Sequence, residues 1–147
     1  MHLEFLSAGR WHITVILDIE PIQQARPRAT RYGRSIRVYD PPKVSKYKKQ
    51  LSQLARLQYN AEPLDGMLAV DIKFYRRVQK SLSKIERSRR LSGVHRPIVK
   101  PDLDNYIKST LDALNGILWT DDAHIVDLHA HKYYSDDPHI EITVTEL

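Results

Sequence analysis

The sequence predicts a single mixed α/β (α+β) domain over residues 1–147, and three observations lead to this fold class. Several stretches alternate apolar and polar residues as strands do, and others carry apolar residues at helical spacing. The sequence contains no internal repeat. With 147 residues, of which 41% are apolar, the chain can bury one hydrophobic core. The predicted order is strand, helix, strand, short helix, helix, strand, strand, with a mixed sheet that ends in a hairpin.

The first half of the chain is predicted to contain two strands with a helix between them. Residues 11–19 alternate, with every second side chain apolar, and form the first strand. The arginine-rich segment that follows has no sustained period and is predicted to be a loop, with a short hairpin near residues 32–34. Two prolines then precede a helix over residues 43–59, and residues 67–75 alternate again as the second strand.

The second half is predicted to contain two helices followed by two strands. Residues 83–86, Ser-Lys-Ile-Glu, fit a capping box and predict a short basic helix that runs to Leu91. Residues 125–134 and 140–144 are predicted to be the last two strands, joined by a turn. Before them a longer helix is predicted over residues 102–114, with an apolar stripe formed by Leu103, Ile107, Leu111 and Leu114.

Composition excludes several classes of protein. The chain contains no cysteine, which excludes a disulfide framework, a cysteine-bound metal and a thiol nucleophile. No apolar run approaches the ~20 residues that span a bilayer, and the first residues are too few and too acidic for a signal peptide. We therefore expect a cytoplasmic protein without a membrane partner. Glycine-rich phosphate-binding motifs are also absent, so no nucleotide cofactor is expected.

The distribution of charge indicates a polyanionic partner. The net charge is +5, and residues 25–39 contain five arginines and no acidic residue. Residues 76–100 contain nine Lys or Arg and a single Glu, whereas the last third of the chain is rich in Asp. Basic segments around an acidic centre suit a protein that holds phosphates and hydrolyses one of them.

Asp102 and Asp104 lie at the start of the longer predicted helix, and Lys108 follows one turn after Asp104. A purely structural role would explain these residues: Asp is a favoured N-cap worth ~1 kcal/mol. An Asp–Lys pair four residues apart on a helix is also common, and it contributes only ~0.3 kcal/mol. This motif alone therefore favours a structural interpretation.

A second pair of acids, Asp121 and Asp122, precedes the next strand and changes this balance. If helix and strand pack side by side, the four carboxylates converge and raise one another's pKa values. Bound Mg²⁺ or Mn²⁺ would remove this penalty, because both ions prefer oxygen ligands. A carboxylate-bound metal can activate water and polarise a phosphodiester, and Lys108 would stabilise the negative charge that develops. Together these residues predict phosphodiester hydrolysis.

Three motifs in this region resemble the signature of RusA-type Holliday junction resolvases. They are Lys100-Pro-Asp-Leu-Asp-Asn-Tyr-Ile-Lys108, Leu111-Asp-Ala-Leu-Asn-Gly116 and Asp121-Asp-Ala-His-Ile-Val126, followed by Lys132. The resemblance covers about residues 97–134, and the Arg26-Pro-Arg28 and Tyr39-Asp-Pro-Pro segments are similar to longer members of the family. One departure is His124, where the family pattern usually has Gln; this affects only a secondary contact.

The resemblance implies a RusA-like fold and a homodimeric, Mg²⁺-dependent endodeoxyribonuclease, with Mn²⁺ a plausible substitute. Such an enzyme introduces paired nicks in four-way DNA junctions during recombination and repair. Matched by position, Asp102, Asp104 and Asp122 would bind the metal, with Asp121 a further candidate ligand, and Lys108 would assist catalysis. The side chains expected to contact DNA are Arg26, Arg28, Arg31, Arg34, Lys84, Arg87, Arg89, Arg90, Lys100 and Lys132.

Other interpretations stay open at this point. The chain could be a non-catalytic nucleic-acid-binding module, although acids near phosphate would then weaken binding. Lys132 could cap a sheet edge instead of contacting DNA. The alternating Asp127, His129 and His131 could bind a transition metal, but a polar strand face is the simpler explanation. Finally, Pro101-Asp102 and Asp71-Ile-Lys73 supply both halves of a restriction-like nuclease motif, in the wrong chain order.

Overall fold

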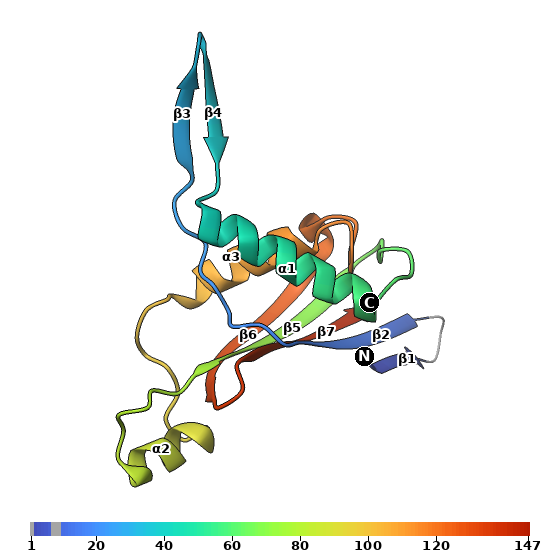
Figure 1. Ribbon diagram of the computed structural model, residues 1–147. Helices are drawn as coiled ribbons and strands as arrows, with labels where there is room; N and C mark the ends of the chain where they lie inside the picture. The colour runs from blue at the N-terminus through green and yellow to red at the C-terminus, as the bar shows by residue number, and fades with distance from the viewer. Residues whose placement is uncertain (1, 7–9) are drawn as a thin grey trace.

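The computed structural model describes residues 2–6 and 10–147, and its main feature is a five-stranded sheet covered on one face by two helices (Figure 1). The mixed α+β class predicted from the sequence is confirmed. In chain order the elements are β1 (His2–Leu6), β2 (Arg10–Leu17), β3 (Arg28–Tyr32), β4 (Ser35–Tyr39), α1 (Pro42–Gln58), β5 (Leu68–Arg77), α2 (Lys84–Leu91), α3 (Leu103–Leu114), a 3-10 turn η1 (Asp122–His124), β6 (Ile125–Ser135) and β7 (His139–Glu146).

The strand order in the sheet is β1-β2-β7-β5-β6, with β5 and β6 parallel and the other neighbours antiparallel. The predicted hairpin of the last two strands is wrong, because β5 lies between β6 and β7. Alternate residues of β5 and β7 are buried along almost their whole length, which suits central strands, whereas the first half of β6 is exposed, as at an edge. The register of β5 with β6 shifts once, between Leu68 and Ala69, where Val126 is an extra residue.

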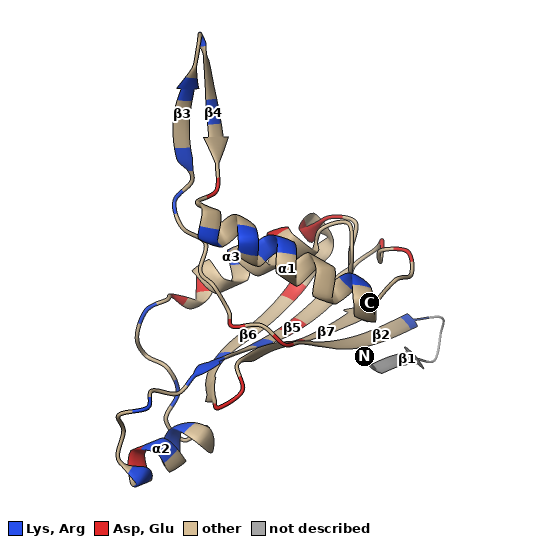
Figure 2. Cartoon of the chain, viewed as in Figure 1, with Lys and Arg blue, Asp and Glu red and all other residues tan. Residues whose placement is uncertain are grey.

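Two basic elements, the β3–β4 hairpin and α2, project from the domain in opposite directions (Figures 1 and 2). The arginine-rich segment is not mainly a loop: residues 28–39 form a two-stranded antiparallel hairpin that turns at Gly33, where φ is +61°. All ten strand residues of this hairpin are exposed. The predicted N-cap of α2 is confirmed, because the Ser83 hydroxyl accepts a hydrogen bond from the Glu86 amide at 3.2 Å, whereas the Glu86 carboxylate contacts Arg90 and His95 instead of completing the capping box.

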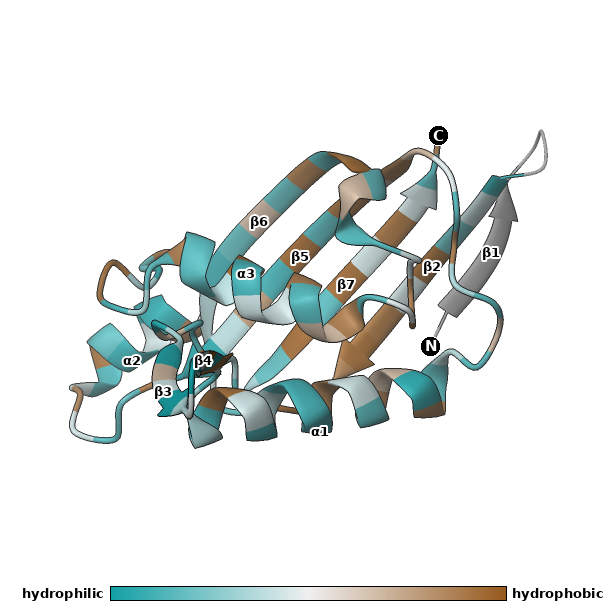
Figure 3. Cartoon of the chain, turned by 90° about the horizontal axis from the view of Figure 1, so that it is seen from above, coloured by the Kyte–Doolittle hydropathy of each residue, from teal (hydrophilic) through white to brown (hydrophobic). Residues whose placement is uncertain are grey.

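The core lies between the sheet and the helices α1 and α3, which cross it (Figure 3). The central strands β2, β5 and β7 contribute the apolar faces that their alternation predicts, which comprise Ile13, Val15, Leu17, Leu68, Val70, Ile72, Phe74, Ile140, Ile142 and Val144. The other face is polar: Thr14 and Thr143 share a hydrogen bond across β2 and β7, and His131 lies 3.2 Å from Asp71. No helix within the described ranges is long and apolar enough to cross a membrane.

The buried face of α3 differs from the predicted leucine stripe. Its buried residues are Tyr106, Ser109, Thr110, Ala113 and Leu114, whereas Leu103, Ile107 and Leu111 are only partly buried at the edge of the core. Small and hydroxyl-bearing residues can face the core here because each hydroxyl has a partner. The Ser109 hydroxyl donates to the Ile22 carbonyl at 2.6 Å, and the hydroxyls of Thr110 and Tyr47 lie 2.9 Å apart.

The Tyr47–Thr110 hydrogen bond joins α1 to α3 inside the core and can be tested by mutation. Thr110→Val keeps the shape of the side chain but removes one hydrogen-bond partner of the buried Tyr47 hydroxyl, so we expect a loss of ~1 kcal/mol in unfolding free energy. Urea denaturation measures this loss. Adding Tyr47→Phe should restore part of it; if the double variant is as unstable as the sum of both single variants, the hydrogen bond does not couple the helices.

Candidate active site

Asp102 precedes the first turn of α3 but does not cap it. Its backbone has the extended conformation of an N-cap residue, yet its carboxylate accepts no hydrogen bond from the amides of the helix. Both carboxylate oxygens instead accept hydrogen bonds from the Lys100 ammonium, at 2.7 and 2.8 Å, and about half of the side chain is exposed. The capping role that would explain Asp102 structurally is therefore not the one it has.

The segment before α3 is held by Lys132 of β6. The Lys132 ammonium donates hydrogen bonds to the carbonyls of Val99 and Pro101 at 2.9 and 2.8 Å. Burial lowers the pKa of Lys132, the charges of Arg76 and Lys100 lower it further, and Asp102 opposes them. Lys132 thus fixes the loop that carries Asp102, while a contact between Lys132 and DNA stays a prediction.

Further along α3, Lys108 forms an ion pair with Asp112 at 3.0 Å rather than with Asp104. Asp104 is exposed at the start of the helix, and most of the Lys108 side chain is also exposed. Asp112 additionally lies 3.5 Å from the ammonium of Lys48 on α1. The helix therefore presents alternating acidic and basic groups on one exposed flank.

Asp121 and Asp122 are neighbouring acids that lie beside this flank. Asp121 caps η1, and the amide of Ala123 donates to its carboxylate at 2.9 Å; this hydrogen bond and one with Asp122 lower the pKa of Asp121. Burial raises the pKa of Asp122, and the neighbouring carboxylates of Asp121 and Asp112 raise it further, against the opposing charge of Lys108. Asp122 is thus the acid at which negative charge accumulates.

The position of Asp122 is set by Asn115, the residue that ends α3. The Asn115 side-chain oxygen accepts hydrogen bonds from the Asp122 amide at 2.9 Å and from the indole of Trp119 at 2.8 Å. Trp119 is fully buried, so this contact ties the turn before β6 to the core. Asn115, a residue of the second family-like motif, therefore both ends the helix and positions Asp122.

The predicted metal ligands are distributed in two places along α3. Asp102 is paired with Lys100 at the start of the helix, and Asp121 and Asp122 lie together near Asp112 and Lys108. Across residues 2–6 and 10–147, no group of three or more acidic or histidine side chains is arranged to hold a metal ion. The donor chemistry nevertheless fits a hard cation, because carboxylate oxygens repel one another at Asp122.

Asp40 and Lys48 belong to this region but were not singled out from the sequence. The Asp40 carboxylate accepts hydrogen bonds from Lys48 at 2.8 Å and from the Gln24 amide at 3.0 Å, and the Lys48 contact is the main reason why the pKa of Asp40 is lowered. The Gln24 backbone amide donates to the carbonyl of Asn105 on α3. Asp40 follows β4 directly, so these contacts connect the base of the β3–β4 hairpin to both helices. The Tyr39-Asp-Pro-Pro segment was the available signal, but its partners are distant in sequence.

Some of the basic residues predicted to contact DNA are held in contacts within the protein, and others are exposed. Arg87 of α2 forms an ion pair with Asp136, and Arg90 binds Glu86 at 3.0 Å while its guanidinium lies over the Tyr134 ring. These two arginines hold α2 against the end of β6. The remaining predicted arginines and Lys84 are exposed, namely Arg26, Arg28, Arg31 and Arg34 around the hairpin and Lys84 and Arg89 on α2.

Comparison with known proteins identifies the class to which this fold and site belong. The family model for endodeoxyribonuclease RusA matches residues 18–145, which is most of the chain, and the chain belongs to this family. Membership implies endodeoxyribonuclease activity on DNA. The chain is also similar to the Bacillus subtilis (strain 168) protein named "Uncharacterized protein YqaN", with 39% identity over 131 residues that cover 87% of this chain and 92% of that protein.

The opposite pKa directions of Asp40 and Asp122 predict opposite effects of pH on stability. The lowered pKa of Asp40 means that its ionised form stabilises the fold above the ordinary pKa of 3.8, and that this contribution is lost as the pH falls through its folded-state value. Asp40→Asn should therefore lower the unfolding free energy at pH 7 by up to ~1 kcal/mol, with little effect at acid pH.

The raised pKa of Asp122 means that ionising this carboxyl opposes folding. The unfolding free energy falls as the pH rises from 3.8 to the folded-state pKa, stays lower above it, and is unaffected by Asp122 below 3.8. Asp122→Asn should therefore unfold at a higher temperature than the unmodified protein at pH 7 without divalent cations, and at the same temperature near pH 3. Thermal unfolding at both pH values measures this. A lower midpoint for Asp122→Asn at pH 7 would contradict the inferred crowding of carboxylates.

Proposed function

We propose that this protein is a Mg²⁺-dependent, structure-specific endodeoxyribonuclease that resolves four-way DNA junctions by paired phosphodiester hydrolysis, as a homodimer acting in recombination and repair. Its membership of the RusA family supports the DNA substrate. The observation that carries the catalytic proposal is the position of Asp122, which lies beside further carboxylates and the ammonium of Lys108. A dimer would place two such sites across a junction that has approximate two-fold symmetry.

The residues that would hold the metal are Asp122 together with Asp121 or Asp112, with Asp102 and Asp104 approaching from the start of α3. Mg²⁺ commonly keeps several waters and binds one or two carboxylates together with substrate phosphate, so a preformed group of three ligands is not required. When bound, the metal would supply a more acidic water and a more electrophilic phosphorus. The exposed Lys108 ammonium, held by Asp112, would stabilise the negative charge on the phosphorane-like transition state.

Lys100 and Lys132 would contribute by placement. Lys132 fixes the loop of residues 99–101, and Lys100 holds the carboxylate of Asp102. Because the Lys100 side chain is mostly exposed, a DNA phosphate could replace Asp102 as the ion-pair partner of its ammonium and free the Asp102 carboxylate. Substrate binding would in this way exchange an internal ion pair for one with DNA, and make Asp102 available as a ligand.

Substitution of the acids tests the catalytic proposal. Asp102→Asn and Asp122→Asn should each lower cleavage of a labelled four-way junction in Mg²⁺ by at least ~100-fold, while junction affinity measured in Ca²⁺ stays within a few-fold. Asp127→Asn, which alters an exposed acid on the polar face of the sheet, is the matched control and should cleave normally. Full cleavage by Asp102→Asn would remove that residue from the site.

Metal binding can be measured without catalysis. Titration with Mn²⁺ followed by electron paramagnetic resonance should show binding by the unmodified protein, and Asp122→Asn should weaken it at least ~10-fold. Junction cleavage that disappears with a chelator and returns with Mg²⁺ supports the nuclease. The alternative is a non-catalytic nucleic-acid-binding module, which would use the exposed arginines around the β3–β4 hairpin equally well. Binding without any metal-dependent cleavage of either branched or linear DNA would establish that alternative.

A further inference from the structure

The two faces of the β3–β4 hairpin differ in chemistry. Residues that pair directly across the strands share a face, and alternate residues lie on opposite faces. One face carries only side chains that can donate hydrogen bonds: Arg28, Thr30, Tyr32, Ser35, Arg37 and Tyr39. The opposite face is mainly apolar and consists of Ala29, Arg31, Ile36 and Val38. The hairpin therefore has a single face suited to a polar, anionic partner.

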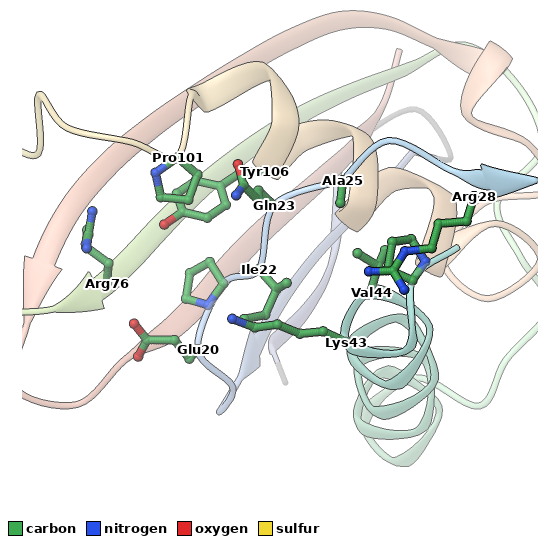
Figure 4. Close-up of a pocket in the computed structure, with 12 residues that line it drawn as sticks. Glu20, Ile22, Gln23, Ala25, Arg28, Lys43, Val44, Arg76, Pro101 and Tyr106 are labelled. Carbon is green, nitrogen blue, oxygen red and sulfur yellow. The ribbon is translucent and has the colours of Figure 1, made fainter. Parts of the chain in front are cut away.

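The polar face of the hairpin continues into a pocket at the start of α3 (Figure 4). Arg28 lines this pocket of about 460 Å³, together with Lys43 at the start of α1 and Arg76 at the end of β5. The pocket reaches Pro101, the neighbour of Asp102, and Tyr106 forms part of its wall. Arg28 thus belongs both to the hairpin face and to a cavity beside the proposed catalytic acid.

Four cationic side chains from four elements connect the hairpin with Asp102, and we call them the cationic track: Arg37, Arg28, Lys43 and Arg76. Glu20 is the one acid among the described residues that line the pocket, and its carboxylate already accepts a hydrogen bond from the Arg77 amide. A second copy of this hairpin would be repelled by the arginines, whereas a phosphodiester backbone would be attracted.

We propose that the cationic track binds the backbone of one duplex arm of DNA and leads it from the hairpin to Asp102. This inference rests on the proposed function for its substrate and adds the path by which that substrate enters. Each strand of the hairpin has five residues and is roughly 16 Å long, comparable with the rise of roughly five base pairs. The hairpin contacts the arm beyond the branch point with its Arg28–Arg37 face. Arg31, which the sequence had led us to expect among the DNA contacts, lies on the other face and in this arrangement contributes no phosphate contact.

The connection between track and site is rigid at its base. Asp40 ends the hairpin and binds Lys48, which also reaches Asp112 on α3, and Gln24 binds both Asp40 and the Asn105 carbonyl. The hairpin cannot turn about its base without breaking these contacts. A duplex held on the track therefore has a fixed direction relative to α3.

The test compares variants that lose the same charge at different places. Affinity for a four-way junction is measured in a chelator over a range of KCl concentrations, because each phosphate contact adds ~0.9 to the slope of log affinity against log salt. Arg37→Ala and Lys43→Ala should each reduce this slope by about 1 and weaken binding ~5–10-fold. Lys49→Ala, an exposed lysine of α1 away from the pocket, is the charge-matched control and should keep the slope.

Arg31→Ala tests the assignment of faces, because it removes an arginine from the same hairpin on the opposite side. It should keep the slope and weaken binding less than ~2-fold, whereas Arg37→Lys, which retains the charge, should resemble the unmodified protein. Equal slope losses for Arg31→Ala and Arg37→Ala would overturn the face assignment, and unchanged slopes for Arg37→Ala and Lys43→Ala would overturn the track. The chelator excludes cleavage, so these outcomes are independent of whether the protein proves to be a nuclease.

Discussion

The close packing of α3 against α1 is the constraint on which the site depends. The buried hydroxyls of Ser109 and Thr110 face inward because the Ile22 carbonyl and the Tyr47 hydroxyl satisfy them. This choice of buried face fixes the rotation of α3 about its axis. Lys108 and Asp112 consequently lie on an exposed flank, within electrostatic reach of Asp122. A helix that buried its leucines instead would present a different set of charges.

Acidic and basic groups alternate throughout the site, and the resulting ion pairs hold the acids in fixed orientations. Lys100 binds Asp102, Lys108 binds Asp112, and Lys48 joins Asp112 to Asp40. Asp122 is the exception, since its nearest neighbours include two other carboxylates. The unbalanced negative charge is therefore concentrated at one residue, as a site that receives a cation requires.

The local sequence pattern predicted the helices and strands, but it could not predict contacts between residues that are distant in sequence. Alternation and helical spacing located every strand from β5 onward and all three helices within a few residues, and the predicted N-cap Ser83 was confirmed. The insertion of β5 between β6 and β7 depends on pairing between strands that are distant in sequence, and β1 lies in a segment assessed only as a possible signal peptide. The candidate acids could be named from their motif, but their separation into two places and the role of Asp40 arise from contacts between distant residues.

The extra residue Val126 in β6 decides the side of the sheet on which the rest of that strand displays its side chains. Leu68 pairs with Ile125 and Ala69 with Asp127, so one residue is passed over and the alternation of β6 is inverted from there on. Without that inversion Lys132 would lie on the polar face while His129 and His131 faced the helices, and the carbonyls of Val99 and Pro101 would lose their donor. The side-chain alternation of one strand, β6, thus determines whether Lys132 can hold the loop that carries Asp102.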